Sequence, residues 1–188
     1  IVVFIALELL SIPLYVLAAF ASTNASSEES GIKYFLLGAF SGSFVVYGIA
    51  LVFGATGTTA IAEIAAAASA GTANVPLMLA GSALILVGFG FKVAAVPFQM
   101  WTPDVYQGAP TSVTAFMAAG AKIAGFAALM RVFSTAFPSI AADLTPVLAV
   151  LAALTMIVGN VAAIAQKNIK RMLAYSSIAH AGYILMAF

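Results

Sequence analysis

Cysteine, histidine and charge are scarce in this sequence, and each shortage excludes a class of site. Without cysteine, the chain forms no disulfide and holds no thiolate-ligated iron–sulfur cluster or cysteine-rich zinc site. One histidine leaves few ligands for any other metal ion. Seven Lys or Arg and six Asp or Glu amount to 7% of the 188 residues, with a net charge of +1. Nucleic-acid binding needs clustered basic residues, so this composition excludes it.

The same scarcity of charge excludes a water-soluble globular fold. Soluble domains carry roughly 25% charged residues, whereas 64% of this chain is hydrophobic and its mean hydropathy is +1.15. A membrane-spanning helix needs about 20 mostly apolar residues, and six segments meet that requirement: 1–21, 34–53, 77–96, 113–133, 144–165 and 172–188. None shows the alternation over about 10 residues that is typical of barrel strands. We therefore predict an all-α, polytopic transmembrane helix bundle within a lipid bilayer.

Both ends of the sequence lie inside apolar segments, Ile1 without a preceding Met and Phe188 without a polar tail. We expect a fragment of a longer protein, truncated at both ends. The first segment contains Glu8 and is longer than the apolar core of a signal peptide, which has about 7–15 residues. We interpret it as a spanning helix.

The basic residues predict which end of the bundle faces the cytoplasm. Four of them flank the first, third and fifth connections, on one side of the membrane: Lys33, Lys167, Lys170 and Arg171. Only Arg131 flanks the connections on the other side. Because cytoplasmic loops carry the excess of Lys and Arg, we expect connection 166–171 in the cytoplasm and both chain ends on the outer face.

Pro97 and Pro103 lie between the third and fourth segments. Pro97 removes a helical hydrogen bond and Pro103 repeats the interruption. We therefore expect the third helix to break near Val96 and to continue as a short tilted piece. Broken helices often mark ion pathways in transporters. An ordinary interfacial turn, anchored by Trp101 and Tyr106, is the alternative interpretation.

Three charged residues fall within the predicted spans: Glu8, Lys92 and Lys122. Lys122 is near the middle of its span, about 15 Å from either end at roughly 1.5 Å per residue, so its side chain cannot reach the membrane surface. A lysine at the centre of a span costs roughly 2.5–3.5 kcal/mol, which implies a partner, a water-filled cavity or a neutral amine. Glu8 shares a helix face with Ser11 and Tyr15. Its partner is one of the two lysines, and the sequence leaves both open.

His180 is the centre of a second polar stripe, which includes Ser176, Ser177 and Tyr183. A single histidine is most often a hydrogen-bonded core residue. Because the ordinary pKa of histidine is about 6.5, it is also a competent proton relay wherever water reaches it. Both roles stay open at this point.

Three stretches resemble the antiporter-like membrane subunits of respiratory complex I. They are residues 90–110 (GFKVAAVPFQMWTPDVYQGAP), 8–15 (ELLSIPLY) and 170–183 (KRMLAYSSIAHAGY). Two details favour the N-type subunits within this family. Residues 118–123 (AAGAKI) stand where the L- and M-type subunits and the related sodium/proton antiporters carry a histidine-containing stretch, and residues 102–106 (TPDVY) also look N-type.

The resemblance implies an inverted-repeat, antiporter-like fold of about fourteen spans, of which this chain would supply the fifth to the tenth. It also assigns roles to individual residues. Glu8 would be the carboxylate that modulates Lys92, the central proton-holding amine on the broken helix. Lys122 would be the next station for the proton and His180 a later one, while Lys33 is a weaker candidate on the side where protons are taken up.

The function that the resemblance implies is proton translocation across a bacterial inner (plasma) membrane, by a multi-pass subunit of NADH:quinone oxidoreductase. Redox chemistry in other subunits would drive it, so the chain would work with other membrane subunits, water and protons. No cofactor is expected in this chain, because NAD, FMN, iron–sulfur clusters and quinone would bind to partner subunits. Two alternatives remain. One is a subunit of a cation/proton (Mrp-type) antiporter, and the other is a non-translocating scaffold in which Glu8, Lys92 and Lys122 are fixed ion pairs.

Overall fold

The computed structural model describes residues 1–21 and 23–188. Ser22, the first residue of the expected connection 22–33, lies outside the described residues. Helices are the only regular secondary structure within those ranges. They are α1 (Val2–Ala18), α2 (Ala25–Thr56), α3 (Ile61–Ser69), α4 (Val75–Val93), α5 (Trp101–Gly108), α6 (Thr111–Phe116), the π-helix η1 (Met117–Ala121), α7 (Lys122–Ala136), the 3₁₀ helix η2 (Pro138–Ile140), α8 (Ala141–Ile164) and α9 (Ile169–Met186). The all-helical prediction is confirmed.

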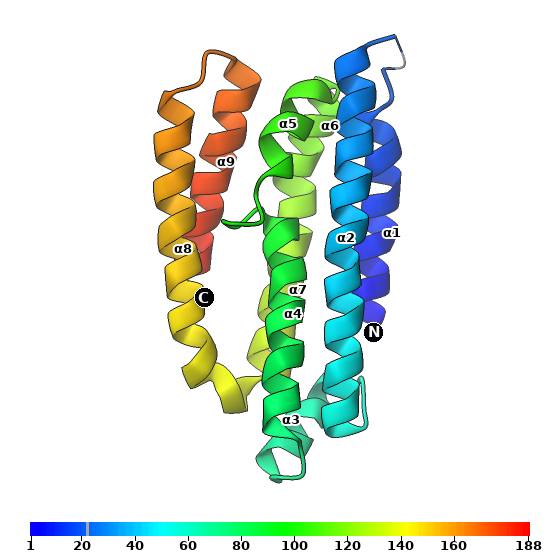
Figure 1. Cartoon of the computed structure of the whole chain (residues 1–188), viewed down its shortest axis with the longest axis vertical. Helices are drawn as coiled ribbons and strands as arrows, with labels where there is room; N and C mark the ends of the chain where they lie inside the picture. Colours follow the sequence, from blue (N-terminus) through cyan, green and yellow to red (C-terminus); the bar gives the residue numbers. More distant parts are fainter. Residues whose placement is uncertain (22) are drawn as a thin grey trace.

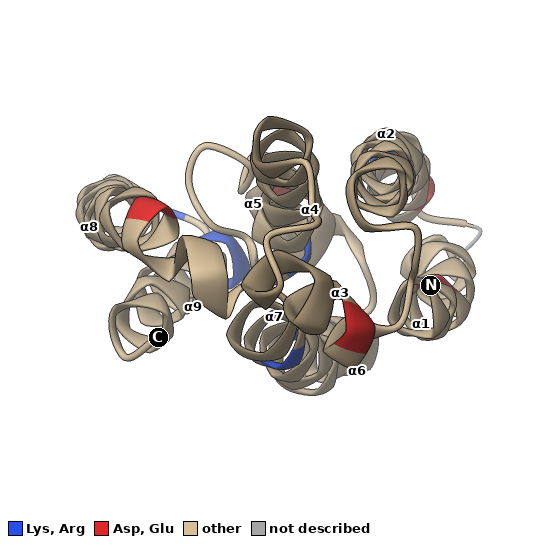
Figure 2. Ribbon diagram, turned by 90° about the horizontal axis from the view of Figure 1, so that it is seen from below, with Lys and Arg blue, Asp and Glu red and all other residues tan. Residues whose placement is uncertain are grey.

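The long helices run along one axis, and the most extensive contacts join α8 to α9 and α2 to α4. Viewed from below, α8 lies beside α9, α4 beside α7, and α2 beside α1 (Figure 2). The α1–α2, α5–α6 and α8–α9 connections gather at the upper end, while α3 and the α7–α8 connection lie at the lower end (Figure 1). The first, third and fifth connections therefore share one end, as the predicted topology requires.

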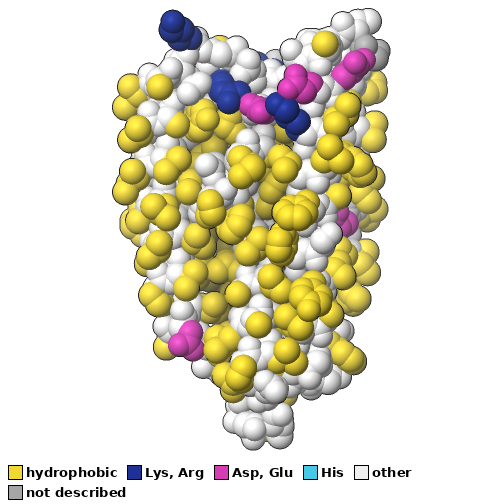
Figure 3. Space-filling view, viewed as in Figure 1, with side chains coloured by type: hydrophobic (Ala, Val, Ile, Leu, Met, Phe, Trp, Pro, Cys, Tyr) yellow, Lys and Arg dark blue, Asp and Glu magenta, His cyan; other side chains and the backbone are white. Residues whose placement is uncertain are grey.

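Charge and hydrophobicity separate along this axis. Figure 3 shows acidic and basic side chains gathered at the upper end, above a broad band in which hydrophobic side chains dominate the visible face. Four helical segments are long and apolar enough to cross a membrane: Ala25–Thr56, Val75–Val93, Thr111–Ala136 and Pro138–Ile164. Val2–Ala18 is apolar but shorter. That all six predicted segments cross a bilayer stays a proposal.

Helix α2 takes up most of the polar stretch 22–33 that we expected to be a connection. The side chain of Asn24 caps the N-terminus of this helix. The hydroxyls of Ser27 and Ser30 then donate hydrogen bonds to the carbonyl oxygen of Ala18, at 2.8 and 3.1 Å. Both serines are buried, because they satisfy the end of α1 instead of facing solvent. The expectation was wrong because polar residues at a helix start can be structural caps.

The predicted break in the third helix is confirmed, but it begins three residues before Pro97. Ala94 has a φ of 62° and a ψ of 40°, in the left-handed region. Its N–H donates to Phe91 O at 3.1 Å, and the N–H of Ala95 donates to Gly90 O at 2.8 Å. This hydrogen-bond pattern is a Schellman motif, which ends an α-helix by satisfying its last carbonyls. The left-handed residue ends α4, and Pro97 keeps the chain from resuming it at once.

Helix α5 is the short continuation that the sequence predicts after the break. Pro103 does not interrupt it, because this proline lies in the first turn, where a missing N–H costs nothing. The interfacial-turn alternative is wrong, since Trp101 and Tyr106 are 3% and 2% exposed. The indole of Trp101 stacks on the ring of Tyr34 from α2, with ring centroids 4.6 Å apart. Aromatic packing against α2 therefore holds α5 inside the bundle.

Helices α2 and α4 are in backbone contact because glycines face each other at the crossing. A Cβ atom added to Gly81 would lie 2.8 Å from Gly48 O, and one added to Gly48 would lie 2.7 Å from Gly81 O. In a membrane, helices associate through such close packing of small residues. This contact fixes the position of α4, the helix that carries Lys92.

Adding a methyl group at this crossing should separate the helices. We expect Gly81→Ala to lower the free energy of unfolding of the full-length protein by about 1–3 kcal/mol, the usual cost of overpacking. The midpoint of thermal unfolding measures this loss. Gly54→Ala on α2 is the control, because its added Cβ would meet only the mobile end of Leu77, at 3.3 Å. Equal midpoints for the two variants would contradict a tight backbone contact at Gly81.

Candidate functional site

Glu8 and Lys92 form an ion pair between α1 and the last turn of α4. Lys92 Nζ lies 3.0 Å from Glu8 Oε1, and the two side chains are 10% and 22% exposed. The same ammonium donates a hydrogen bond to Ser11 Oγ at 2.6 Å, and Ser11 donates to Leu7 O at 2.6 Å. Of the two lysines that the sequence left open, the structure therefore places Lys92 next to Glu8.

The helix face that carries Glu8 continues into a tight contact with α2. Glycines on α2 make room for it: a Cβ on Gly38 would lie 2.2 Å from the hydroxyl oxygen of Tyr15. A Cβ on Gly42 would lie 3.6 Å from Glu8 Oε1, which is ordinary contact distance. A groove of about 440 Å³ between α1 and α2 includes both Glu8 and Gly42 in its lining. One side of the acid is therefore open, while its other side faces Lys92.

Lys122 is buried, and the described part of the chain offers it no acidic partner. Its side chain is bonded by neutral groups on α9, where Nζ donates to Ser177 Oγ at 2.7 Å and to Ser177 O at 2.8 Å. Within residues 1–21 and 23–188, no carboxylate oxygen lies within 4.0 Å of this ammonium. The residue is 7% exposed. The two lysines therefore differ in their electrostatic environment, since of the two it is Lys92 that forms an ion pair with a carboxylate.

A π-helical turn comes directly before Lys122. The segment η1, Met117–Ala121, interrupts the α-helical pattern between α6 and α7. Such turns are rare and often occur at functional sites. The sequence carried no signal for it, because alanine and glycine in this stretch are equally compatible with an ordinary helix. The π turn changes the direction in which the following residues face, Lys122 first among them.

His180 shares a groove with Lys122. The groove has a volume of about 390 Å³, lies between α7 and α9, and includes Lys122, Ser177 and His180 in its lining. His180 Nδ1 is 2.8 Å from the carbonyl oxygen of Ser176. A carbonyl only accepts, so Nδ1 carries the hydrogen, and in the neutral ring Nε2 is left as the acceptor. The side chain of His180 is exposed.

Lys33 lies in a separate cluster of ion pairs at the upper end of the bundle. Its Nζ lies 2.7 Å from Glu29 Oε1 and 2.8 Å from Asp104 Oδ2. The other oxygen of Asp104 accepts a hydrogen bond from Arg171 at the start of α9. The structure brings Lys33 together with these surface groups and not with Glu8. Its predicted role in proton uptake stays a prediction.

Four buried polar atoms without a hydrogen-bond partner in the described chain were not predicted from the sequence. They are Tyr15 Oη, Gln99 Oε1, Thr102 Oγ1 and Tyr106 Oη. Three of them belong to the break or to α5. Buried polar groups are almost always bonded to protein or to ordered water. Gln99 and Thr102, which lie between Pro97 and Pro103, could have indicated a polar interior at the break, because polar residues are unusual in so apolar a chain.

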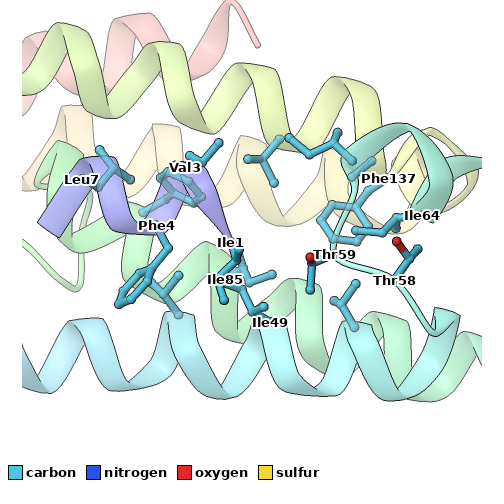
Figure 4. A pocket seen from close by; sticks show the side chains of 16 residues that line it. Ile1, Val3, Phe4, Leu7, Ile49, Thr58, Thr59, Ile64, Ile85 and Phe137 are labelled. Carbon is cyan, nitrogen blue, oxygen red and sulfur yellow. The ribbon is translucent and has the colours of Figure 1, made fainter. Parts of the chain in front are cut away.

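The described residues contain no group of three His, Asp or Glu side chains that could bind a metal ion. A separate cavity of about 60 Å³ between α1, α2, α3, α4 and α7 is lined by uncharged side chains, among them Phe4, Ile49 and Phe137 (Figure 4). Its only hydroxyls come from Thr58 and Thr59. It has no side chain that could bind or transfer a proton near neutral pH.

Comparisons with known proteins match the whole chain. A family described as "NADH:quinone oxidoreductase/Mrp antiporter, TM" matches residues 1–188. The NADH-quinone oxidoreductase subunit N of Trichlorobacter lovleyi is 58% identical over 187 residues, which cover 99% of this chain and 38% of that protein. The chain thus spans less than two-fifths of the length of this curated relative.

Solved structures give the same picture. Respiratory complex I from Thermus thermophilus contains a chain that is 49% identical, with a TM-score of 0.82 over 98% of this chain and 39% of that one. The Mrp complex from Dietzia sp. DQ12-45-1b matches with a TM-score of 0.85 at 24% identity, over 97% of this chain and 34% of that one, and this likeness shows the fold alone. Since the family match extends over every residue of the sequence, this chain belongs to the NADH:quinone oxidoreductase/Mrp antiporter family of transmembrane proteins.

Proposed function

We propose that this chain is part of the N subunit of an NADH:quinone oxidoreductase and carries protons across the membrane. One observation supports this most directly: a lysine paired with an acid at a helix break, and a second buried lysine without an acid. The identity of 58% to a subunit N agrees with the N-type assignment. The chain covers 38% of that relative, so the proposal concerns the part of a proton path that these helices would form.

The Glu8–Lys92 pair supplies an electrostatic control over proton binding. A carboxylate about 4 Å from an ammonium contributes roughly 4 kcal/mol at an effective dielectric constant of about 20. If Glu8 moves away from Lys92, this stabilisation of the ammonium form is lost and release of a proton is favoured. The open groove beside Glu8 leaves space for such a movement.

Lys122 would be the next group to hold the proton. Its hydrogen bonds go to the neutral oxygens of Ser177, so no fixed negative charge holds its proton in place. His180 lines the same groove and has Nε2 free to accept a proton when the ring is neutral. Lys122 lies on α7, in the middle of the bundle, and His180 lies on α9, across the bundle from α1 (Figure 2).

Partners and location follow from the same proposal. Electron transfer would take place in other subunits, and their conformational or electrostatic changes would move Glu8 relative to Lys92. We place NAD, FMN, iron–sulfur clusters and quinone in those partner subunits and no redox centre in this chain. The location would be a bacterial plasma membrane, because the similar subunit N is bacterial and the chain has several helices able to span a bilayer.

The two other functions are less well supported. An Mrp-type antiporter would share the fold of the Dietzia complex, but identity to that complex is 24%, against 58% to a subunit N. Exchange of cations for protons by the complete complex without quinone reduction would favour this function. A scaffold held by ion pairs needs an acid for each buried lysine, and none lies within 4.0 Å of Lys122 among the described residues.

Removing the charge of Glu8 should uncouple proton transfer. We expect Glu8→Gln in the complete complex to move fewer protons per NADH oxidised, because a change of about 1.4 kcal/mol already alters protonation of Lys92 tenfold. Proton uptake by inverted vesicles during NADH oxidation measures the ratio. Glu28→Gln, on the exposed first turn of α2, is the control and should keep it. A normal ratio in an assembled Glu8→Gln complex would show that this charge is not needed.

Lys122 should be needed for proton movement and not for assembly. We expect Lys122→Ala to assemble and to pump below the normal ratio, because no ion pair is broken when the ammonium is removed. The amount of complex on native gels and the protons moved per NADH measure the two effects. Lys167→Ala, in the exposed α8–α9 turn, is the control. Loss of assembly with an unchanged ratio in the remaining complex would favour the scaffold function instead.

A further inference from the structure

The helix break is held by a side chain from α8. The N–H of Val96 donates a hydrogen bond to Thr155 Oγ1 at 2.9 Å. Thr155 is completely buried, and its own hydroxyl proton is donated to Leu151 O. Its γ-oxygen is therefore free to accept from the loop. Without it, the amide of Val96 would be a buried donor with no helical partner, which is costly away from water.

The hairpin of α8 and α9 also holds the far end of α5. Lys170 Nζ donates to the carbonyl oxygen of Ala109, the residue that caps α5, at 2.6 Å. Arg171 donates to Asp104 in the first turn of the same helix. Together with Thr155, these contacts bind both the loop and α5 to one hairpin. Figure 1 shows the loop after α4 reaching across towards α8 and α9.

The loop is attached just as firmly to the end of α4. Trp101 Nε1 donates to Phe91 O at 3.0 Å, so this carbonyl, which also accepts from the N–H of Ala94, has a second donor in the indole. The ring of Phe98 lies directly over Gly90, where an added Cβ would be 2.7 Å away. These contacts flank Lys92 in the chain, since Phe91 is the residue before it. A change in the loop must therefore reach the turn that carries the ammonium.

We propose that Thr155 is a positioning residue for Lys92. It holds the break, through the N–H of Val96, in the conformation that keeps the ammonium of Lys92 on Glu8 and Ser11. The same hydrogen bond also couples the position of the α8–α9 hairpin to the conformation of the break. This hairpin carries Ser177 and His180. This inference rests on the proposed function, because a positioning role has meaning only if Lys92 exchanges protons.

The test compares three variants in the complete complex. Thr155→Val has nearly the same shape and cannot accept the hydrogen bond, and Thr155→Ser keeps the hydroxyl. Thr145→Val, on the exposed face of the same helix, removes a hydroxyl that bonds only to Ala141 O and is the matched control. Two readouts are measured: protons moved per NADH oxidised, and hydrogen–deuterium exchange of the peptide that contains Val96.

We expect Thr155→Val to exchange the Val96 amide about fivefold faster, the effect of losing one net hydrogen bond. We expect it to pump fewer protons per NADH, since a misplacement of about 1 Å can cost on the order of 100-fold in a step that needs aligned groups. Thr155→Ser should restore both values, and Thr145→Val should change neither.

Other outcomes overturn the inference. They are a normal proton ratio in Thr155→Val, or an equal loss in Thr155→Val and Thr155→Ser. If Thr155→Val does not assemble, Thr155→Ala removes the hydroxyl without adding volume, and a normal ratio there also overturns it. Failure of both to assemble, with Thr155→Ser intact, would assign Thr155 a purely structural role. If Glu8→Gln and Lys122→Ala lower the ratio while Thr155→Val does not, only this inference fails and the proposed function stands.

Discussion

Interrupting a helix in an apolar medium leaves polar backbone groups that water cannot satisfy, and this constraint organises much of the structure. Three backbone groups at the end of α4 and in the loop that follows have partners from different sources. The carbonyl of Gly90 accepts from the loop itself, that of Phe91 accepts from the indole of Trp101, and the amide of Val96 donates to Thr155. Satisfying the break therefore requires α5, buried aromatic residues and α8 to be in place together.

The last turn of α4, directly before the break, carries a charged side chain inside the bundle. Lys92 is in the last turn of α4, so its ammonium lies near the interruption and within reach of α1. Glu8 balances the charge of Lys92, and their attraction offsets part of the free-energy cost of burying both groups. Lys122 follows a π-helical turn, and among the described residues its ammonium donates to the oxygens of Ser177, so the two lysines occupy different electrostatic environments. Under the proposed function, this difference would let a proton occupy one lysine in one conformation and the other lysine in another.

Close packing of glycines makes these polar contacts possible. Because Gly48 and Gly81 have no side chains, α2 and α4 come into backbone contact. Gly38 likewise leaves room for the ring of Tyr15. At the other side of the bundle, a Cβ on Gly159 in α8 would lie 2.7 Å from the amide nitrogen of Ala179 in α9. The hairpin is thus a tight unit, and it is attached to α5 through Lys170 and Arg171.

Local patterns along the chain were enough to predict the all-helical fold, the positions of most helices, the break near Pro97 and the charges within the spans. Those conclusions depend on local properties, namely apolar length, proline chemistry and the cost of charge in lipid. Other features became visible only once the helices were packed together: Glu8 pairs with Lys92, α2 begins within the polar stretch, Trp101 is buried, and Thr155 bonds to the loop. Each of these depends on which helix faces which. A pattern along one helix does not carry that information, because the partners are up to 84 residues apart.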